Sequence, residues 1–294
     1  MKPKMKAAKS VAKKQEMMTV GDLPRDFMEE TGYTLADYSV AIGYSVDGKP
    51  PTMAPIGSGV LVRRGDRYGI LTAHHCIHKP GHDLQVGNTT GDTVLLLLKR
   101  RKPMRLPPEV LVKHGLAIPR TSEFGPDLAF LEILPSPQLG SIKAACSFWN
   151  LDKSPSQIGR KFGKLMTPFV VVGYPAEFSQ TSVQGLTTRF AMKHMAFYYS
   201  ISADGLPIRD GWDYVEANCW HHEKSDLPES FAGVSGGPVW GLEIKRDKKT
   251  GKFAMLDFAL IGIAFFQTGI KNDERRIRAH FIKSIYRTCW KNLK

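Results

Sequence analysis

The chain has 294 residues and 42% hydrophobic content, which is enough for about two domains with a sizeable buried core. Its formal net charge is +13, but residues 1–18 carry +5 and residues 271–294 carry +6, so the middle of the chain is nearly neutral. A nucleic-acid-binding domain concentrates basic charge on a folded face, so we do not expect a nucleic-acid partner. No apolar run reaches the roughly 18 residues that cross a bilayer, which predicts no membrane span.

The basic N-terminal segment, residues 1–18, contains six lysines and no apolar stretch behind them. A secretory signal requires such a stretch, so we expect a disordered basic tail and a cytoplasmic protein. One internal basic cluster, Lys99–Lys102, follows an apolar run and is interpreted as a solvated hairpin tip.

The body of the chain contains short apolar or alternating runs that are rich in β-branched and aromatic residues and separated by Gly/Pro turns. The clearest of these runs are Thr93–Leu98, Leu128–Leu134, Phe169–Pro175 and Phe258–Phe266. They predict a β-rich body. The last segment, Asp273–Leu293, has a different pattern, with apolar residues at four-residue spacing, which predicts an amphipathic helix. Docking on the body is favoured for this helix over binding to a membrane surface.

Three segments carry side chains suited to nucleophilic catalysis. His75 follows an apolar run in GILTAHHCIH, and Asp127 precedes another in FGPDLAFLEI. Ser235 lies in GVSGGPVW among glycines, which take positive φ and admit close backbone approach. Such a turn can expose the serine hydroxyl and aim the N–H groups of Gly233 and Ser235 at one point, as an oxyanion hole requires.

The order His, Asp, Ser and the residues around each motif resemble the trypsin-like (chymotrypsin) serine protease family, from about Gly57 to Gly269. The resemblance implies an all-β fold of two six-stranded β-barrels, a double β-barrel over residues 19–135 and 136–270, with a C-terminal α-helix over residues 271–294. It also implies a serine endopeptidase in which His75 is the general base, Asp127 orients it and Ser235 is the nucleophile. The adjacent His74 is then a packed neighbour.

Substrate preference can also be proposed from the resemblance. Glu229 lies six positions before Ser235, where a carboxylate would favour Lys or Arg in a protein or peptide substrate; a surface glutamate on a loop is the equal alternative. Phe266 and Gln267 would form part of the pocket wall. Val234 stands where digestive members have an aspartate, so we expect no activation by N-terminal cleavage, and gating by a regulatory protein partner is a hypothesis.

Secreted members of the family usually pair the cysteine after the histidine with one before it, but PIGSGVLV contains none, so the cysteines are expected to be free thiols. The long stretch Ala176–Leu227 is expected to contain a hairpin that bears on specificity. A zinc site is an alternative because histidines and cysteines gather in two stretches, but their spacing lacks the regularity of known sites. We therefore expect no metal and no cofactor. The crowded residues are His74, His75, Cys76, His78, His82, Cys219, His221 and His222.

Two other functions remain open from the sequence. The chain could be a catalytically silent binding or sensor module on a protease fold, or a viral polyprotein-processing protease. A prokaryotic intracellular protease is favoured over the viral one because the chain has its own start methionine and no flanking polyprotein.

Overall fold

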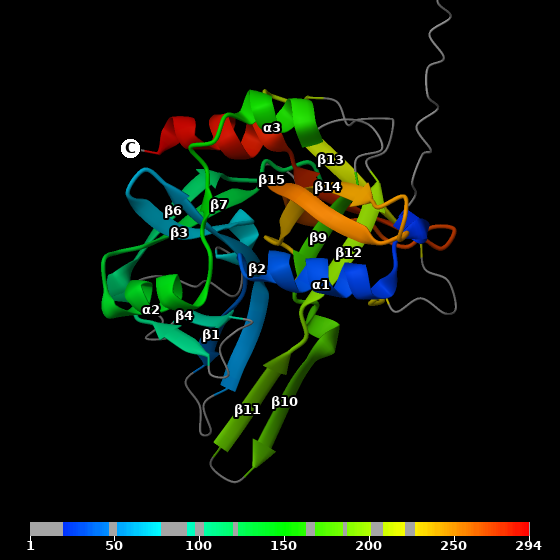
Figure 1. Cartoon of the computed structure of the whole chain (residues 1–294). Helices are drawn as coiled ribbons and strands as arrows, with labels where there is room; N and C mark the ends of the chain where they lie inside the picture. The colour runs from blue at the N-terminus through cyan, green and yellow to red at the C-terminus, as the bar shows by residue number, and fades with distance from the viewer. Residues whose placement is uncertain are drawn as a thin grey trace, which may run out of the picture.

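The computed structural model of the chain describes residues 20–46, 52–77, 93–97, 103–119, 123–162, 168–184, 187–200, 208–220 and 227–293. The chain is mostly β, with two large antiparallel sheets and one separate hairpin (Figure 1). The basic segment 1–18 and the cluster Lys99–Lys102 lie outside the described residues. In the part of the chain that is described, none of the helices combines the length and the apolar character that a membrane crossing needs.

The first sheet has eight strands in the order β5-β4-β1-β2-β3-β7-β6, with β8 pairing parallel to β2, and it curls into a half-barrel (Figure 1). Alternate residues of its central strand face two different cores. Leu61 packs inside this sheet, whereas Val60 and Val62 belong to the core shared with the second sheet. Its strands are β1 Ser39–Val46, β2 Thr52–Arg64, β3 Arg67–Thr72, β4 Thr93–Leu97, β5 Met104–Leu106, β6 Leu111–Ala117, β7 Leu128–Ile133 and β8 Trp149–Asn150.

The second sheet has six antiparallel strands in the order β12-β9-β14-β15-β16-β13. Trp240 and Phe169 are fully buried beneath it and belong to the shared core. A hairpin of β10 and β11 projects from the body at the bottom of Figure 1, within the stretch where the sequence predicts one. The bounds are β9 Pro168–Gly173, β10 Ser179–Gln184, β11 Thr187–Met192, β12 Met195–Ser200, β13 Tyr214–Trp220, β14 Pro238–Arg246, β15 Phe253–Gln267 and β16 Glu274–His280.

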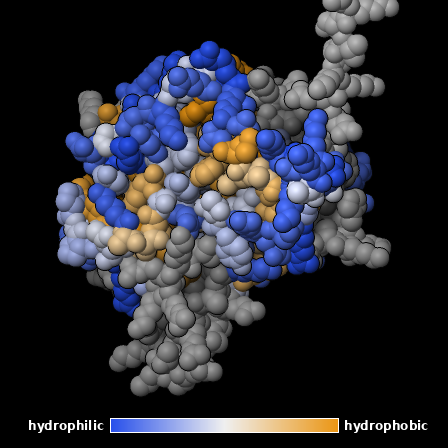
Figure 2. Space-filling view, viewed as in Figure 1, coloured by the Kyte–Doolittle hydropathy of each residue, from blue (hydrophilic) through white to orange (hydrophobic). Residues whose placement is uncertain are grey.

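Among the described residues, three α-helices that the sequence analysis did not predict cover parts of the sheets (Figure 1). They are α1 Arg25–Ala36, α2 Pro137–Ala145 and α3 Pro155–Phe162. Short helical turns complete the structure: η1 Val20–Asp22, η2 His74–Cys76, η3 Pro108–Val110, η4 Ala176–Phe178, the π-helical η5 Ser284–Thr288 and η6 Cys289–Asn292. Hydrophilic residues cover most of the face shown in Figure 2, with smaller apolar patches between them.

The C-terminal segment corrects the predicted helix over residues 271–294. Residues Glu274–His280 form strand β16, which pairs with both β13 and β15, and only the residues after it are helical. The second sheet therefore runs past residue 270, the predicted end of the second barrel. Residues 277–280 are all buried, since β16 lies between two neighbouring strands, so pairing within the sheet takes precedence over the four-residue spacing that suggested a helix.

Candidate functional site

Ser235 lies in a tight turn that leads into β14. Gly233 and Gly236 in this turn have φ of +90° and +83°, a region that favours glycine. A side chain at Gly233 would place its Cβ 2.5 Å from the Tyr174 carbonyl oxygen, and one at Gly236 would collide with Thr72 and Ser58. The glycines therefore allow the turn to lie directly against strands β2 and β3 of the first sheet and against the residues that follow β9 of the second.

Ser58 of β2 holds this turn from the side of the first sheet. Its N–H donates to the Ser235 carbonyl at 2.7 Å, and its hydroxyl donates to the Gly233 carbonyl at 2.6 Å. The same hydroxyl accepts the Tyr174 N–H at 3.0 Å, and the Ser58 side chain is fully buried. Sequence reasoning missed Ser58, although a lone polar residue between two glycines in an apolar strand is a signal that could have indicated it.

The backbone N–H groups of the turn divide into engaged and free donors. Those of Val234, Gly236 and Gly237 donate to carbonyls at 2.7 to 2.9 Å. Those of Gly233 and Ser235 have no acceptor among the described residues. The two free donors are the ones that the sequence predicts to bind an oxyanion.

His75 and Asp127 meet because their strands pair. Asp127 directly precedes β7 and His75 lies in η2, just after β3, and β3 pairs with β7 up to the Thr72–Ala129 position. His75 Nδ1 lies 2.5 Å from Asp127 Oδ2, and the His75 N–H donates to Asp127 Oδ1 at 3.0 Å. The carboxylate thus holds both the ring and the backbone of the histidine.

The environment of this pair is asymmetric. The Asp127 side chain is 5% exposed and that of His75 is 34% exposed. Burial lowers the pKa of His75, but interactions with Cys76 and with the Asp127 carboxylate raise it more, so the net pKa lies above the usual value of 6.5. Because Asp127 occupies Nδ1, Nε2 is the nitrogen left for a reacting group.

The contact between the Ser235 turn and the His75–Asp127 pair is made by Cys76, the residue that follows His75. The Cys76 Sγ–H donates to the Ser235 carbonyl at 3.4 Å, and a Cβ on Gly57 would touch both Cys76 and Ser235. Among the described residues, no hydrogen bond joins the Ser235 hydroxyl to His75. Catalytic hydrogen bonds are often long before substrate binds. The structure therefore joins His75 to Asp127 directly and places Ser235 beside Cys76.

A small cavity of about 10 Å³ adjoins Ser235, near the minimum that holds one water molecule. Gln267 closes one side of it and is fixed by its own hydrogen bonds. Its Oε1 accepts the Phe231 N–H at 2.8 Å and Arg275 Nη1–H at 3.0 Å, and its Nε2 donates to Ser230 Oγ at 3.3 Å. The remaining wall is mostly apolar and includes Phe231, Val234, Phe265, Phe266 and Ile277.

The structure places Glu229 elsewhere. Glu229 is exposed and does not line the cavity beside Ser235, so a role for its carboxylate in receiving a Lys or Arg side chain stays a prediction. The alternative of a surface glutamate fits its position. His74 is buried, and a Cβ on Gly115 would touch its ring, so it is packed against β6.

All four cysteines are free, and three of them, Cys76, Cys219 and Cys289, are buried. Within the described residues, no group of three or more His, Cys, Asp or Glu side chains could hold a metal ion. The other histidines of the zinc alternative, His78, His82, His221 and His222, lie outside those residues.

Comparison of the chain with models of known protein families and with curated proteins finds no match in either set.

Proposed function

We propose that the chain is a serine endopeptidase of the trypsin-like type, in which Ser235, His75 and Asp127 act together. In this proposal the two large sheets correspond to the two β-barrels of that family. Two features around Ser235 carry the proposal. The backbone N–H groups of Gly233 and Ser235 have no acceptor in the described part of the chain. The Ser235 carbonyl contacts Cys76, which directly follows His75, and the imidazole of His75 is held by the buried Asp127 carboxylate.

Each residue then has a defined chemical role. The Ser235 hydroxyl attacks the carbonyl carbon of a peptide bond while His75 Nε2 accepts its proton, and Asp127 stabilises the resulting imidazolium. The N–H groups of Gly233 and Ser235 bind the oxyanion. The C–N bond breaks as His75 returns the proton to the amine, and water then hydrolyses the acyl-enzyme ester by the same base.

The cavity beside Ser235 supports a substrate preference that differs from Lys or Arg. Because the cavity has room for about one water molecule and its walls are mostly apolar, we expect the residue whose carbonyl is attacked to be small, Gly or Ala. Gln267 is the side chain that sets this limit, since its three hydrogen bonds hold it at the cavity wall. The same proposal includes a protein or peptide as the substrate, the cytoplasm as the location and gating by a regulatory protein partner as an option.

Covalent labelling tests the function directly. The folded chain is treated with a fluorophosphonate probe and analysed by intact-mass and peptide mass spectrometry. We expect one adduct on Ser235, which is lost in Ser235→Ala. Ser156→Ala is the matched control, because it removes a serine hydroxyl on α3, which forms no part of the candidate site, and we expect it to label normally.

A second function, a binding or sensor module without turnover, is favoured by one specific observation. No hydrogen bond joins the Ser235 hydroxyl to His75 in the described part of the chain, and the adjoining cavity is almost filled. Wild-type chain that stays folded and forms no adduct on Ser235 would support the module and overturn the endopeptidase.

A further inference from the structure

The loop that carries Asp127 is held by the second sheet, although Asp127 itself precedes a strand of the first. Two residues of β16, Arg278 and His280, contact this loop at separate points. They are two positions apart on one strand, so their side chains leave the same face of the sheet.

His280 binds the loop at Asp127 itself. Its ring is fully buried, and its Nε2 accepts the Asp127 N–H at 3.0 Å. The ring is stacked on Phe265 with centroids 4.6 Å apart, and Trp212 lies edge-on at 5.3 Å. Burial among these rings lowers the pKa of His280 to about 3, so the imidazole stays neutral and Nε2 keeps its lone pair at ordinary pH.

The state of Nδ1, the other ring nitrogen of His280, indicates the role of this residue. A neutral ring that accepts at Nε2 carries its proton at Nδ1. His280 Nδ1 is buried and has no hydrogen-bond partner among the described residues. An apolar ring would fill the same space without a buried, unpaired donor. The acceptor at Nε2 is therefore the polar function that distinguishes histidine from phenylalanine at this position.

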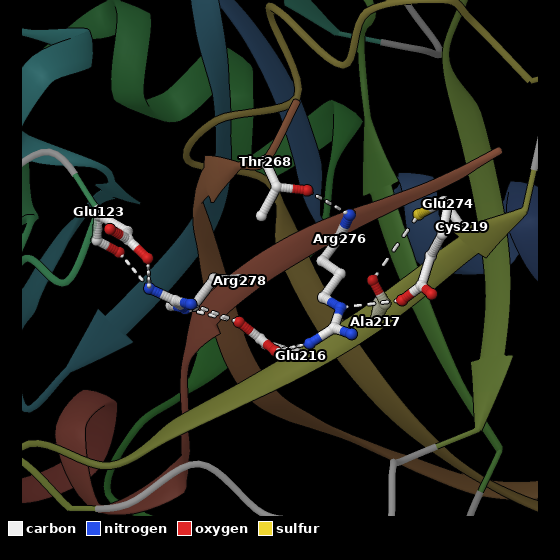
Figure 3. Close-up of polar contacts among 8 residues, drawn as sticks. All are labelled: Glu123, Glu216, Ala217, Cys219, Thr268, Glu274, Arg276 and Arg278. Atoms are coloured by element: carbon white, nitrogen blue, oxygen red, sulfur yellow. Dashed lines mark hydrogen bonds and ion pairs between the residues drawn. The ribbon is translucent and has the colours of Figure 1, made fainter. Parts of the chain in front are cut away.

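Arg278 holds the other end of the loop (Figure 3). Its Nη1 donates to the Glu123 carbonyl at 2.5 Å, and its guanidinium lies 4.3 Å from the centre of the Phe124 ring. Glu216 of the neighbouring strand β13 fixes the guanidinium with hydrogen bonds of 2.5 and 2.8 Å to a single carboxylate oxygen. The side chains of Arg278 and Glu216 are 7% and 9% exposed, so the pair is largely shielded from water.

We propose that β16 positions the acid of the candidate triad, His280 by accepting the Asp127 N–H and Arg278 by holding Glu123 and Phe124. The carboxylate of Asp127 is then presented to the N–H and the ring of His75 from a backbone that is held at both ends of the loop. The effect of β16 on catalysis rests on the proposed function. The hydrogen bond between the Asp127 N–H and His280 Nε2, and its effect on the pKa of His75, do not depend on that function.

Two substitutions separate positioning from packing. His280→Phe keeps a ring against Phe265 and removes the acceptor, whereas His280→Gln can accept at nearly the same place through its side-chain carbonyl. In ¹⁵N-histidine-labelled full-length chain, we expect His280→Phe to lower the pKa of His75 and weaken its Nδ1 proton signal. We expect the rate of fluorophosphonate labelling at Ser235 to fall at least tenfold. His280→Gln should return the His75 pKa and its Nδ1 proton signal to the wild-type values and bring the labelling rate to within about threefold of wild type.

Tyr286→Phe is the matched control. It removes another buried polar group, a hydroxyl that accepts from Trp149 Nε1 and donates to the Leu260 carbonyl, without touching the Asp127 loop. If His280 had a purely structural role, the pKa of His75 would be the same in His280→Phe and in Tyr286→Phe. That result would overturn the proposal. If the wild-type chain forms no adduct, the proposed function fails, but the NMR comparison still decides the role of His280.

The wild-type chain decides the matter if His280→Phe does not fold. The N–H···N hydrogen bond should give a measurable coupling between the Asp127 amide nitrogen and His280 Nε2, and slow exchange of the Asp127 amide proton. An Asp127 amide that exchanges as fast as an unprotected one would overturn the proposal.

Discussion

Ser58→Ala tests how the Ser235 turn is held in place. The fully buried Ser58 hydroxyl serves two backbone groups, the Gly233 carbonyl and the Tyr174 N–H, and alanine leaves both without this partner. An unpaired buried polar group costs about 1–3 kcal/mol. Because Gly233 is only half-buried, water can partly satisfy its carbonyl, so we expect the free energy of unfolding to fall by about 2–4 kcal/mol.

The same substitution should affect reactivity. The Gly233 carbonyl belongs to the turn that carries the two free N–H groups, so loosening it should slow labelling of Ser235 by roughly 10- to 100-fold, somewhat less than the ~10²–10³ for loss of one oxyanion donor. Urea denaturation measures the stability, and timed mass spectrometry measures the labelling.

Ser39→Ala is the matched control for this prediction. Ser39 is also fully buried, but its hydroxyl makes one long hydrogen bond of 3.4 Å, to the Leu35 carbonyl, which also accepts from the Tyr38 N–H. We expect a loss of only about 0.5–1 kcal/mol and normal labelling. Equal stability losses in the two variants, with unchanged labelling in Ser58→Ala, would refute the idea that Ser58 holds the turn.

Three further predictions concern acid–base behaviour, specificity and the ion pair on β16. The reaction needs neutral His75, whose pKa is raised, so the labelling rate should increase with pH with a midpoint above 6.5. Asp127→Asn should lower that midpoint and reduce the labelling rate by about 10⁴. A labelling rate that does not change with pH would contradict His75 as the base. In a peptide library, cleavage should follow Gly or Ala, and Gln267→Ala should admit larger apolar residues, whereas cleavage after Lys or Arg would contradict the cavity volume. Glu216→Ala removes the two shortest ion-pair contacts of the buried Arg278 guanidinium and leaves it the Glu123 carbonyl and the Glu123 carboxylate at 3.8 Å. It should therefore cost about 2–3 kcal/mol in urea denaturation, less than the ~3–5 kcal/mol for a buried charge left with no partner, and a loss below ~1 kcal/mol would show that water reaches the guanidinium.

Sequence periodicity predicted the body of the fold well where strands are short and apolar. Strands β4 Thr93–Leu97, β7 Leu128–Ile133 and β9 Pro168–Gly173 cover most of three of the predicted runs, and β15 contains the whole of the fourth, Phe258–Phe266. Burial on both faces explains the success, since a strand between two cores is apolar along most of its length. The double barrel itself stays a proposal, because periodicity does not specify how a sheet closes.

The prediction of a C-terminal helix was wrong for a physical reason. Ile277, Phe281 and Ile285 have helical spacing, but pairing of Glu274–His280 with two neighbouring strands outweighs that local preference. A segment with apolar residues at both two- and four-residue intervals cannot be assigned from periodicity alone. Neighbouring strands that are distant in sequence decide it.

Some residues of the candidate site could be predicted from the sequence and others could not. The residue order and local motifs drew attention to His75, Asp127 and Ser235, and the structure joins the first two directly. The residues that hold them, Ser58 and His280, come from other strands and have no motif of their own. Their contacts span 175 and 153 positions of the sequence, so only the folded chain reveals them.

The rate at which a fluorophosphonate labels Ser235 in His75→Ala, relative to wild type, is the most direct measurement of whether the imidazole activates the hydroxyl. We expect the rate constant to fall by about 10³ or more, with the fold preserved by circular dichroism. Equal rate constants in the two chains would mean that His75 does not act as the base, and they would contradict the proposed mechanism.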